Sequence, residues 1–260
     1  MTIVLPAYNE AARIDSALDE LFGYLRRRGE QARDGAPGSG HLPDDVRILV
    51  VDDGSSDDTA AMVRARPEAS MGNAHDPILT LLTVPHGGKG AAVRAGMVIT
   101  TTDLVLFADA DMATPPDQLP LLVQALADND LALGSRIQPD GSDMRGSQPL
   151  YRRWLGRVFH TLASLWVVGD VQDTQCGFKG FRGPAAIELF NAQKVTSIVF
   201  DVELIYLARK AGLRIAVVPV HWYDRRGSRM RASPALAMRV AWDLLRIPFL
   251  HRRPGRRRRR

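Results

Sequence analysis

The chain has 260 residues, of which 45% are hydrophobic and 24% charged. This composition fits one α/β domain, alone or with a small appendage, and excludes a wholly disordered protein. The net charge of +5 resides at the C-terminus, because without Arg252, Arg253 and residues 256–260 it would be −2. The single cysteine, Cys176, excludes an internal disulfide. No apolar run reaches the roughly 18 to 20 residues of a membrane-spanning helix, and no signal peptide is recognised, so we expect a soluble or peripheral protein.

Short apolar runs alternate with helical patterns along the chain, which predicts a mostly parallel sheet flanked by helices. The expected strands are residues 2–6, 46–51, 78–84, 104–107, 131–134 and 214–220. The expected helices are residues 10–28, 57–66, 90–99, 119–126, 151–168, 200–211 and 235–250. Segments 31–45 and 137–150 are polar and contain glycine, as surface loops do. We expect the first half to bind a nucleotide and the second half to fit the substrate.

Two adjacent acids, Asp52 and Asp53, follow the expected strand 46–51 and precede a glycine turn. Asp57 could cap the helix that comes next. Ordinary capping needs only one such acid, so Asp52 or Asp53 could instead bind a ribose or a base. The carboxyl ends of parallel strands are where α/β sheets bind their ligands.

A second acidic pair, Asp109 and Asp111, follows the expected strand 104–107. Side chains at i and i+2 after a strand point to the same side, so both carboxylates can share one cation. Mg²⁺ or Mn²⁺ favours such oxygens and commonly bridges to substrate phosphates. The pair therefore predicts a metal site that neutralises a departing diphosphate.

A glycine-rich helix start surrounds Lys89 at residues 87–90. It matches neither the Walker A pattern nor G-x-G-x-x-G, because Val93 occupies the last position of the latter. ATPase and dehydrogenase functions therefore lose support. Backbone amides and a lysine at a helix start can still hold phosphate or ribose.

These three signals, in this order, resemble glycosyltransferase family 2, whose catalytic domain has the GT-A fold. The segments similar to the family's motifs are residues 4–10, 52–57 and 109–111. The segments most similar to its dolichyl-phosphate β-glucosyltransferase branch are residues 134–136, 173–179 and 200–204. Ala113 stands where the mannosyl branch typically has a metal-binding glutamine. The resemblance implies an inverting transfer of a hexose, with UDP-glucose favoured, to polyprenyl or dolichyl phosphate.

The resemblance also implies roles for individual residues. The nucleotide sugar would be lined by Pro6, Ala7, Tyr8, Glu10, Asp52, Asp53, Lys89 and Asp109, and the cation, Mg²⁺ or Mn²⁺, would be held by Asp109 and Asp111. The acceptor phosphate would face Arg136 and either Arg152 or Arg153, although the last two could equally be surface residues.

Asp201 aligns with the position usually assigned as the base of inverting members. A phosphate monoester has a second pKa near 6, so the acceptor is already largely a dianion at neutral pH. Removing a proton then contributes little, whereas positive charge that holds two anions together contributes more. Our hypothesis is that Asp201 orients Lys179 or an arginine, which would make Asp201, Lys179 and Arg136 the catalytic group.

The expected helix 235–250 carries Arg239, Asp243 and Arg246 as one narrow polar stripe on an apolar surface. It can pack on the body as a core helix or lie in a lipid interface. The arginine tail favours the lipid, since each charge near an anionic leaflet adds on the order of 1 kcal/mol. We therefore divide the chain into a catalytic domain, 1–233, and a membrane-surface segment, 234–260, and expect a peripheral protein on the cytoplasmic side of a membrane.

Two alternatives remain at this point. A family member could use GDP-mannose or a soluble acceptor. A protein of another class could bind nucleic acid through its arginine tail, but the acidic body argues against nucleic acid as a partner. A catalytically inactive sensor is disfavoured by the intact acids Asp109, Asp111 and Asp201.

Overall fold

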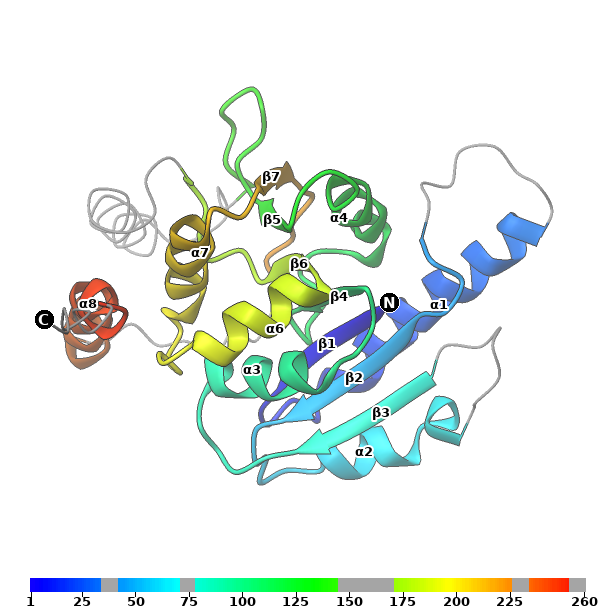
Figure 1. Cartoon of the computed structure of the whole chain (residues 1–260). Helices are drawn as coiled ribbons and strands as arrows, with labels where there is room; N and C mark the ends of the chain where they lie inside the picture. The colour runs from blue at the N-terminus through cyan, green and yellow to red at the C-terminus, as the bar shows by residue number, and fades with distance from the viewer. Residues whose placement is uncertain (34–41, 71–77, 145–170, 226–233, 253–260) are drawn as a thin grey trace, which may run out of the picture.

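The computed structural model describes residues 1–33, 42–70, 78–144, 171–225 and 234–252. Seven strands form one sheet in the order β3-β2-β1-β4-β6-β5-β7 (Figure 1). The strands are β1 (Thr2–Ala7), β2 (Arg47–Asp52), β3 (Ile78–Thr83), β4 (Leu104–Ala108), β5 (Leu131–Ser135), β6 (Phe178–Arg182) and β7 (Ile215–Pro219). Strands β1 to β4 pair in parallel, as do β5 and β7, whereas β6 runs antiparallel to both of its neighbours. The predicted mostly parallel α/β sheet is confirmed.

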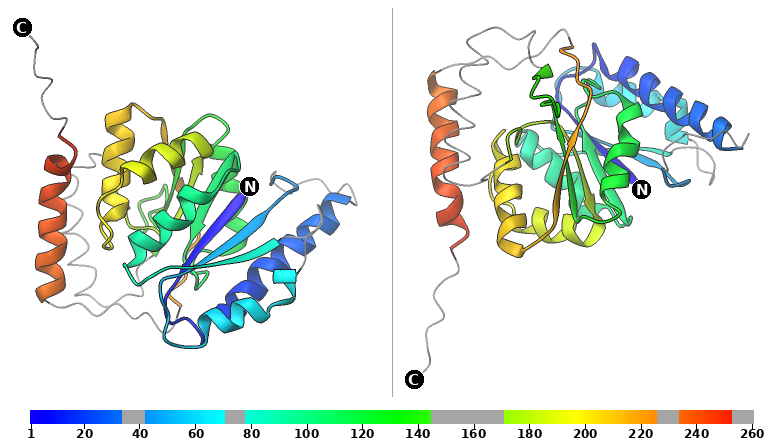
Figure 2. Two further views of the ribbon diagram at one scale, coloured as in Figure 1. Left: turned by 60° about the horizontal axis from the view of Figure 1, so that its bottom comes forward. Right: turned by 90° about the horizontal axis from the view of Figure 1, so that it is seen from above.

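Helices cover both faces of this sheet (Figure 2). They are α1 (Ile14–Arg33), α2 (Thr59–Ala65), α3 (Lys89–Ile99), α4 (Leu119–Ala125), α6 (Gly183–Ala192), α7 (Phe200–Ala211) and α8 (Pro234–Leu250), with short 3₁₀ turns η1 (Pro67–Ser70) and η2 (Pro116–Gln118). Alternate residues of β1 enter different cores, because successive side chains of a strand point to opposite faces. Ile3 and Leu5 pack with α1 and α4, while Val4 packs with α3, α6 and α7.

Two elements were missed by the sequence analysis, β6 and the helix α6 that follows it. In β6 a buried lysine, Lys179, and a glycine, Gly180, interrupt the apolar pattern by which the other strands were recognised. A Cβ at Gly180 would lie 2.9 Å from Cδ1 of Leu126, so a larger residue would have to displace the end of that side chain. The predicted helix 151–168 lies outside the described residues, as do Arg152 and Arg153.

Several expected boundaries shift in the structure. Helix α1 begins at Ile14 rather than residue 10 and continues to Arg33, into the segment expected to be a loop. The N-cap position of α2 is Asp58, and Asp57 acts from one residue earlier by accepting a hydrogen bond from the backbone of Thr59 at 3.0 Å. Helix α8 agrees with the expected helix 235–250. Within the described part of the chain, no helix is long and apolar enough to cross a membrane.

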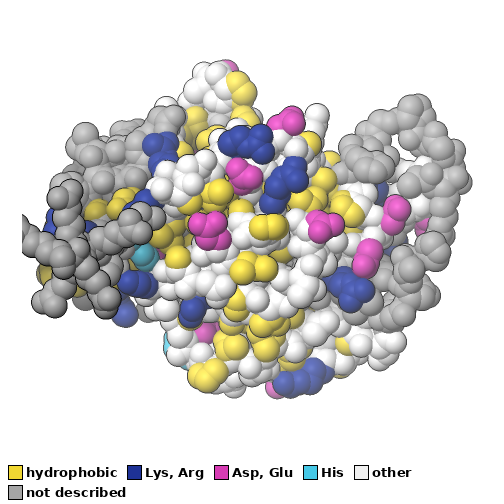
Figure 3. Space-filling view, in the orientation of Figure 1, with side chains coloured by type: hydrophobic (Ala, Val, Ile, Leu, Met, Phe, Trp, Pro, Cys, Tyr) yellow, Lys and Arg dark blue, Asp and Glu magenta, His cyan; other side chains and the backbone are white. Residues whose placement is uncertain are grey.

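Basic and acidic side chains are interspersed over the described surface seen in Figure 3, with apolar side chains between them. The fold thus places the motif-bearing strand ends together on a body of mixed charge.

Candidate active site

The two acids after β4 are brought together with a lysine from α3. The ammonium of Lys89 lies 2.5 Å from Oδ1 of Asp109, and its pKa is raised because Asp109, Asp201 and Asp111 outweigh the effect of burial, which alone would lower it. The pKa of Asp111 is raised by burial and by the negative charge of Asp109. Asp109 and Asp111 both act on the pKa of Lys89, so the three groups lie close together, and the metal site expected from the two acids stays a prediction.

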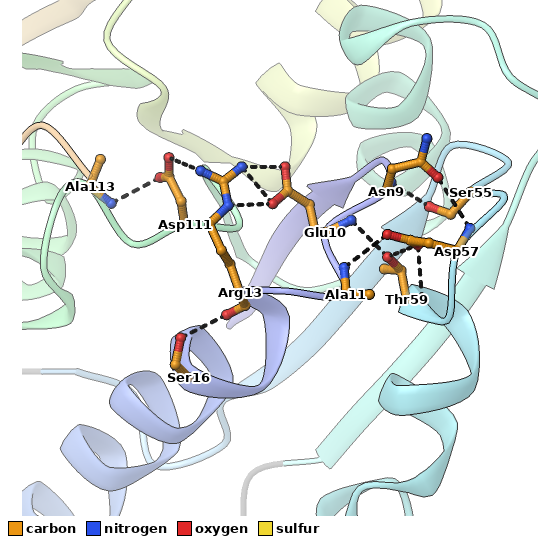
Figure 4. A network of polar contacts seen from close by, with 10 residues as sticks. All are labelled: Asn9, Glu10, Ala11, Arg13, Ser16, Ser55, Asp57, Thr59, Asp111 and Ala113. Carbon is orange, nitrogen blue, oxygen red and sulfur yellow. Dashed lines mark hydrogen bonds and ion pairs between the residues drawn. The ribbon is translucent and has the colours of Figure 1, made fainter. Parts of the chain in front are cut away.

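Arg13 reaches the same carboxylates from the start of α1, and the sequence analysis missed it. Its guanidinium makes two hydrogen bonds of 2.7 Å to Glu10, and Nη1 lies 3.7 Å from Oδ2 of Asp111 (Figure 4). Nη1 is buried without a hydrogen-bond partner. Glu10 was expected to line the nucleotide, but its carboxylate is taken up by Arg13. The only signal in the sequence was the spacing of three residues between them.

The carboxylate of Asp109 lies against a glycine. A Cβ at Gly177 would stand 2.1 Å from Asp109 Oδ2 and 2.5 Å from Oδ1, and the backbone amide of Asp109 donates to the carbonyl of Gly177 at 3.0 Å. Asp111 is fixed by the amide of Ala113, which donates to Oδ1 at 3.0 Å. Met112 between them adopts a left-handed φ of 49°, a conformation that side-chain-bearing residues favour little and that is frequent at functional sites.

These residues fit Mg²⁺ or Mn²⁺. Among the described residues no three His, Cys, Asp or Glu side chains gather at one point, so the protein would supply the carboxylates of Asp109 and Asp111. Hard cations that bind one or two carboxylates take their remaining ligands from phosphates and water. Lys89 lies where it could share the charge of those phosphates.

Asp53 holds the glycine-rich loop. Its two carboxylate oxygens accept hydrogen bonds from the amides of Gly87 at 2.8 Å and Gly88 at 2.9 Å, and the side chain is buried. Gly88 has a φ of 91° at the start of α3, which favours glycine. Asp52 is also buried and accepts a hydrogen bond from the amide of Ser55 at 3.1 Å. Both acids thus shape the loops at these strand ends.

Tyr8 and His86 form an exposed stacked pair above this loop. Their ring centroids are 4.2 Å apart with an interplanar angle of 23°, and Nδ1 of His86 lies 2.9 Å from Oδ2 of Asp53. Two partly exposed rings beside the loop provide a surface on which a nucleobase could stack. His86 was not among the residues singled out from the sequence, because its contacts with Tyr8 and Asp53 depend on the fold.

The first two family motifs are joined by hydrogen bonds. Asn9, with a left-handed φ of 54°, accepts the amide of Ser56 at 2.8 Å, and the amide of Glu10 donates to Thr59 Oγ1 at 2.7 Å (Figure 4). Pro6 and Ala7 lie at the end of β1, where the carbonyl of Ala7 accepts the amide of Asp53 at 2.8 Å. Hydrogen bonds therefore connect the end of β1 and the residues after it to the loop that follows β2.

Arg136 is bound by an acid instead of standing free for a phosphate. Its Nε and Nη2 donate to Asp173 at 2.7 and 2.6 Å, and the guanidinium lies over the Trp222 ring at 5.7 Å. Asp173 holds the pKa of Arg136 above its usual value although burial opposes this. The predicted role of Arg136 at the acceptor phosphate stays a prediction, and it could involve only the donors that Asp173 does not use.

Lys179 and Asp201 form a buried pair. The ammonium lies 2.8 Å from Oδ1 of Asp201, donates to the carbonyl of Cys176 at 2.5 Å and stands 5.4 Å from the centre of the Phe107 ring. Burial raises the pKa of Asp201, against the effects of Lys179 and Lys89. This arrangement agrees with the hypothesis that Asp201 orients Lys179, and it makes Lys179 a positioning residue because its side chain is fully buried.

Comparison with known proteins identifies the family. The family model described as glycosyl transferase family 2 matches residues 2–190. The chain belongs to glycosyltransferase family 2. Its relatives include the dolichyl-phosphate β-glucosyltransferase ALG5C of Trichomonas vaginalis, 35% identical over 96% of this chain and 71% of that protein. The human dolichyl-phosphate β-glucosyltransferase is 33% identical over 88% of this chain and 69% of that protein.

Solved structures show the same fold. Glucosyl-3-phosphoglycerate synthase from Mycobacterium tuberculosis, in complex with UDP, has a TM-score of 0.60 at 21% identity and covers 95% of this chain and 79% of its own. Another structure of that enzyme holds Mn²⁺, UDP and phosphoglyceric acid. Mannosyl-3-phosphoglycerate synthase from Rubrobacter xylanophilus has a TM-score of 0.61 at 20% identity, over 98% of this chain and 77% of its own. The chain is thus a glycosyltransferase with the GT-A fold.

Proposed function

We propose that this glycosyltransferase moves glucose from UDP-glucose to the phosphate of a polyprenyl or dolichyl phosphate, with inversion, at the cytoplasmic face of a membrane. The observation that carries the proposal is the convergence of Asp109, Asp111 and Lys89 at the carboxyl ends of the strands. Its relatives named for dolichyl phosphate and glucose support the choice of acceptor and sugar.

The residues divide the work between donor and acceptor. Tyr8 and His86 would stack with the base, and the loop held by Asp53 would approach the diphosphate. Asp109 and Asp111 would hold Mg²⁺ or Mn²⁺, which when bound neutralises the leaving diphosphate. The sugar's anomeric carbon is then exposed to attack from the opposite side.

The acceptor needs orientation more than deprotonation. Its phosphate is largely a dianion at neutral pH, so the oxygen that attacks already carries negative charge. Asp201 is buried and paired with Lys179, an arrangement that fixes the start of α7 rather than one that presents a free base. The transfer balances as one C–O bond formed to the acceptor phosphate and one C–O bond broken to UDP.

A donor screen tests the proposal. The purified chain would be incubated with Mn²⁺ or Mg²⁺, a short polyprenyl phosphate and UDP-glucose, GDP-mannose or UDP-N-acetylglucosamine, and the lipid analysed by mass spectrometry. We expect a metal-dependent hexosyl adduct from UDP-glucose and none from an Asp109→Asn/Asp111→Asn variant. An adduct from GDP-mannose would change the sugar, and clear UDP-glucose binding without any lipid adduct would favour a soluble acceptor.

A further inference from the structure

The C-terminal helix α8 turns its acid toward the protein. Asp243 is 3% exposed, accepts a hydrogen bond from Ser197 Oγ at 2.6 Å and lies 2.7 Å from Nη2 of Arg246. Leu244 and Ile247 are buried beside it in a cluster with residues of α7. One face of α8 therefore packs against the body, as expected for a core helix.

The other face of α8 is apolar and exposed. Met238, Trp242, Leu245 and Phe249 are 69%, 63%, 52% and 53% exposed, and their spacing of four, three and four residues aligns them along one side of the helix. We call these four residues the outer stripe. Single exposed apolar side chains are ordinary, whereas a contiguous row marks an interaction surface. A surface helix normally directs charged residues outward, so the outer stripe requires a partner.

Positive charge continues the outer stripe at its C-terminal end. Arg252 is exposed, and its guanidinium lies 4.6 Å from the centre of the Phe249 ring. The sequence then adds Arg253 and residues 256–260. Apolar side chains followed by clustered arginines are what an anionic bilayer binds. A second copy of the chain would bring the same positive charges against these, which repel one another.

We propose that α8 docks the outer stripe into the headgroup boundary of an anionic lipid bilayer, with Arg252 at the lipid phosphates. The inference deepens the proposed function, on which it rests for the choice of a lipid surface. The evidence for it is that α8 packs against the body with the outer stripe exposed, and this evidence does not depend on the donor site.

The position of α8 suits a lipid-borne substrate. It stands beside α7, on the side of the molecule toward which β2 and β3 point (Figures 1 and 2). Lys194 Nζ donates to the Leu250 carbonyl at 2.6 Å, and in the same loop the Thr196 carbonyl accepts the amide of Gly90 at 3.0 Å. One short segment therefore connects α8 to the helix start that carries Lys89.

Flotation with vesicles tests this inference without any glycosyl acceptor. The full chain would be mixed with vesicles of phosphatidylcholine, or of phosphatidylcholine with phosphatidylglycerol. The Trp242→Ser/Phe249→Ser variant removes two members of the outer stripe, and Ile187→Ser, on a 44% exposed residue of α6, is the matched control. We expect the double variant to bind at least about tenfold more weakly and the control to bind as the wild type does.

Three results would overturn the inference. They are a wild-type chain that does not float with anionic vesicles, a double variant that floats equally well, and a wild-type dimer in light scattering that the double variant converts to a monomer. Equal melting temperatures and equal UDP binding would show that the double variant is folded. Glucosyl transfer in detergent without vesicle binding would remove this inference alone, and vesicle binding without transfer would remove the proposed function alone.

Discussion

The ammonium of Lys179 lies 2.8 Å from Oδ1 of Asp201, and both side chains are buried between β6 and α7. Replacing one partner leaves the other charge in the interior without compensation, which typically costs about 3–5 kcal/mol. We therefore expect Lys179→Met to lower the free energy of unfolding by about that amount, measured in urea without substrate. Lys179→Met/Asp201→Asn should recover part of the loss, and a cost below about 1 kcal/mol for Lys179→Met would contradict a structural ion pair.

The role of Asp201 in the reaction is separable from its role in folding. If it only orients Lys179, Asp201→Asn should lower kcat by a factor that stays constant with pH. Base catalysis predicts instead that activity lost in Asp201→Asn returns as pH rises and the acceptor phosphate ionises fully. A pH–rate profile from about pH 5 to 9, which brackets that ionisation, distinguishes the two, and recovery at high pH would restore Asp201 as the base.

Gly177 controls the position of a metal ligand. Because a Cβ at this position would lie 2.1 Å from the carboxylate of Asp109, Gly177→Ala should displace that carboxylate and weaken Mn²⁺ binding by at least about tenfold, or about 1.4 kcal/mol. Electron paramagnetic resonance of free Mn²⁺ measures this directly. Gly29→Ala is the matched control, since no heavy atom lies within 4 Å of its Cβ position, and unchanged Mn²⁺ affinity in Gly177→Ala would contradict the argument.

Lys89 should oppose the metal and favour the donor. Its ammonium lies 2.5 Å from Asp109 Oδ1, so Lys89→Gln removes a positive charge that competes for this carboxylate. We expect Mn²⁺ affinity without nucleotide to rise severalfold, while UDP-glucose affinity in the presence of Mn²⁺ falls. Calorimetric titration of the metal and then of the nucleotide checks both signs, and a parallel loss of both affinities would show that Lys89 merely supports the fold.

The reactivity of Cys176, which precedes Gly177, depends on its burial and on pH. Burial raises the pKa of Cys176 to about 11, so the reactive thiolate is scarce at neutral pH. Iodoacetamide at pH 8 should therefore alkylate the folded chain at least about 100-fold more slowly than the chain in urea. Because the unfolded thiol ionises first, this group lowers the free energy of unfolding as pH rises from about 8.5 toward 11. Equal alkylation rates would contradict the buried thiol.

The sequence predicted the residues whose chemistry is local and missed those whose role depends on the fold. Asp109 and Asp111 were found because two acids directly after a buried strand share one side of it. The contacts of Arg13 with Asp111 at 3.7 Å and of His86 with Asp53 at 2.9 Å could not be found this way, since each joins residues that are far apart in the sequence. The engagement of Arg136 by Asp173 joins residues 37 positions apart, and such pairing is set by tertiary packing.

The prediction of helices and strands also succeeded where the pattern is local and failed where it depends on the fold. Strands built from continuous apolar residues, such as β2 and β4, were recognised by composition. Strand β6 was missed because Lys179 and Gly180 interrupt its apolar pattern, and the sequence gives no sign that Asp201 pairs with the buried lysine. The sequence did not predict which face of α8 packs against the body, because nothing in its polar stripe indicates that Asp243 is buried.

The contact at Gly90 has a consequence for how such enzymes can be recombined. A Cβ there would lie 2.8 Å from both the Thr196 carbonyl oxygen and Phe200, and its own carbonyl accepts a hydrogen bond from Gln193 at 3.0 Å. The donor-binding half and residues 193–200 therefore meet so closely at Gly90 that no side chain fits at this position, because the Thr196 backbone cannot move aside as a flexible side chain can. A chimaera that takes its N-terminal half from another family member should fold only if it inherits a glycine here or brings residues 193–200 from the same parent.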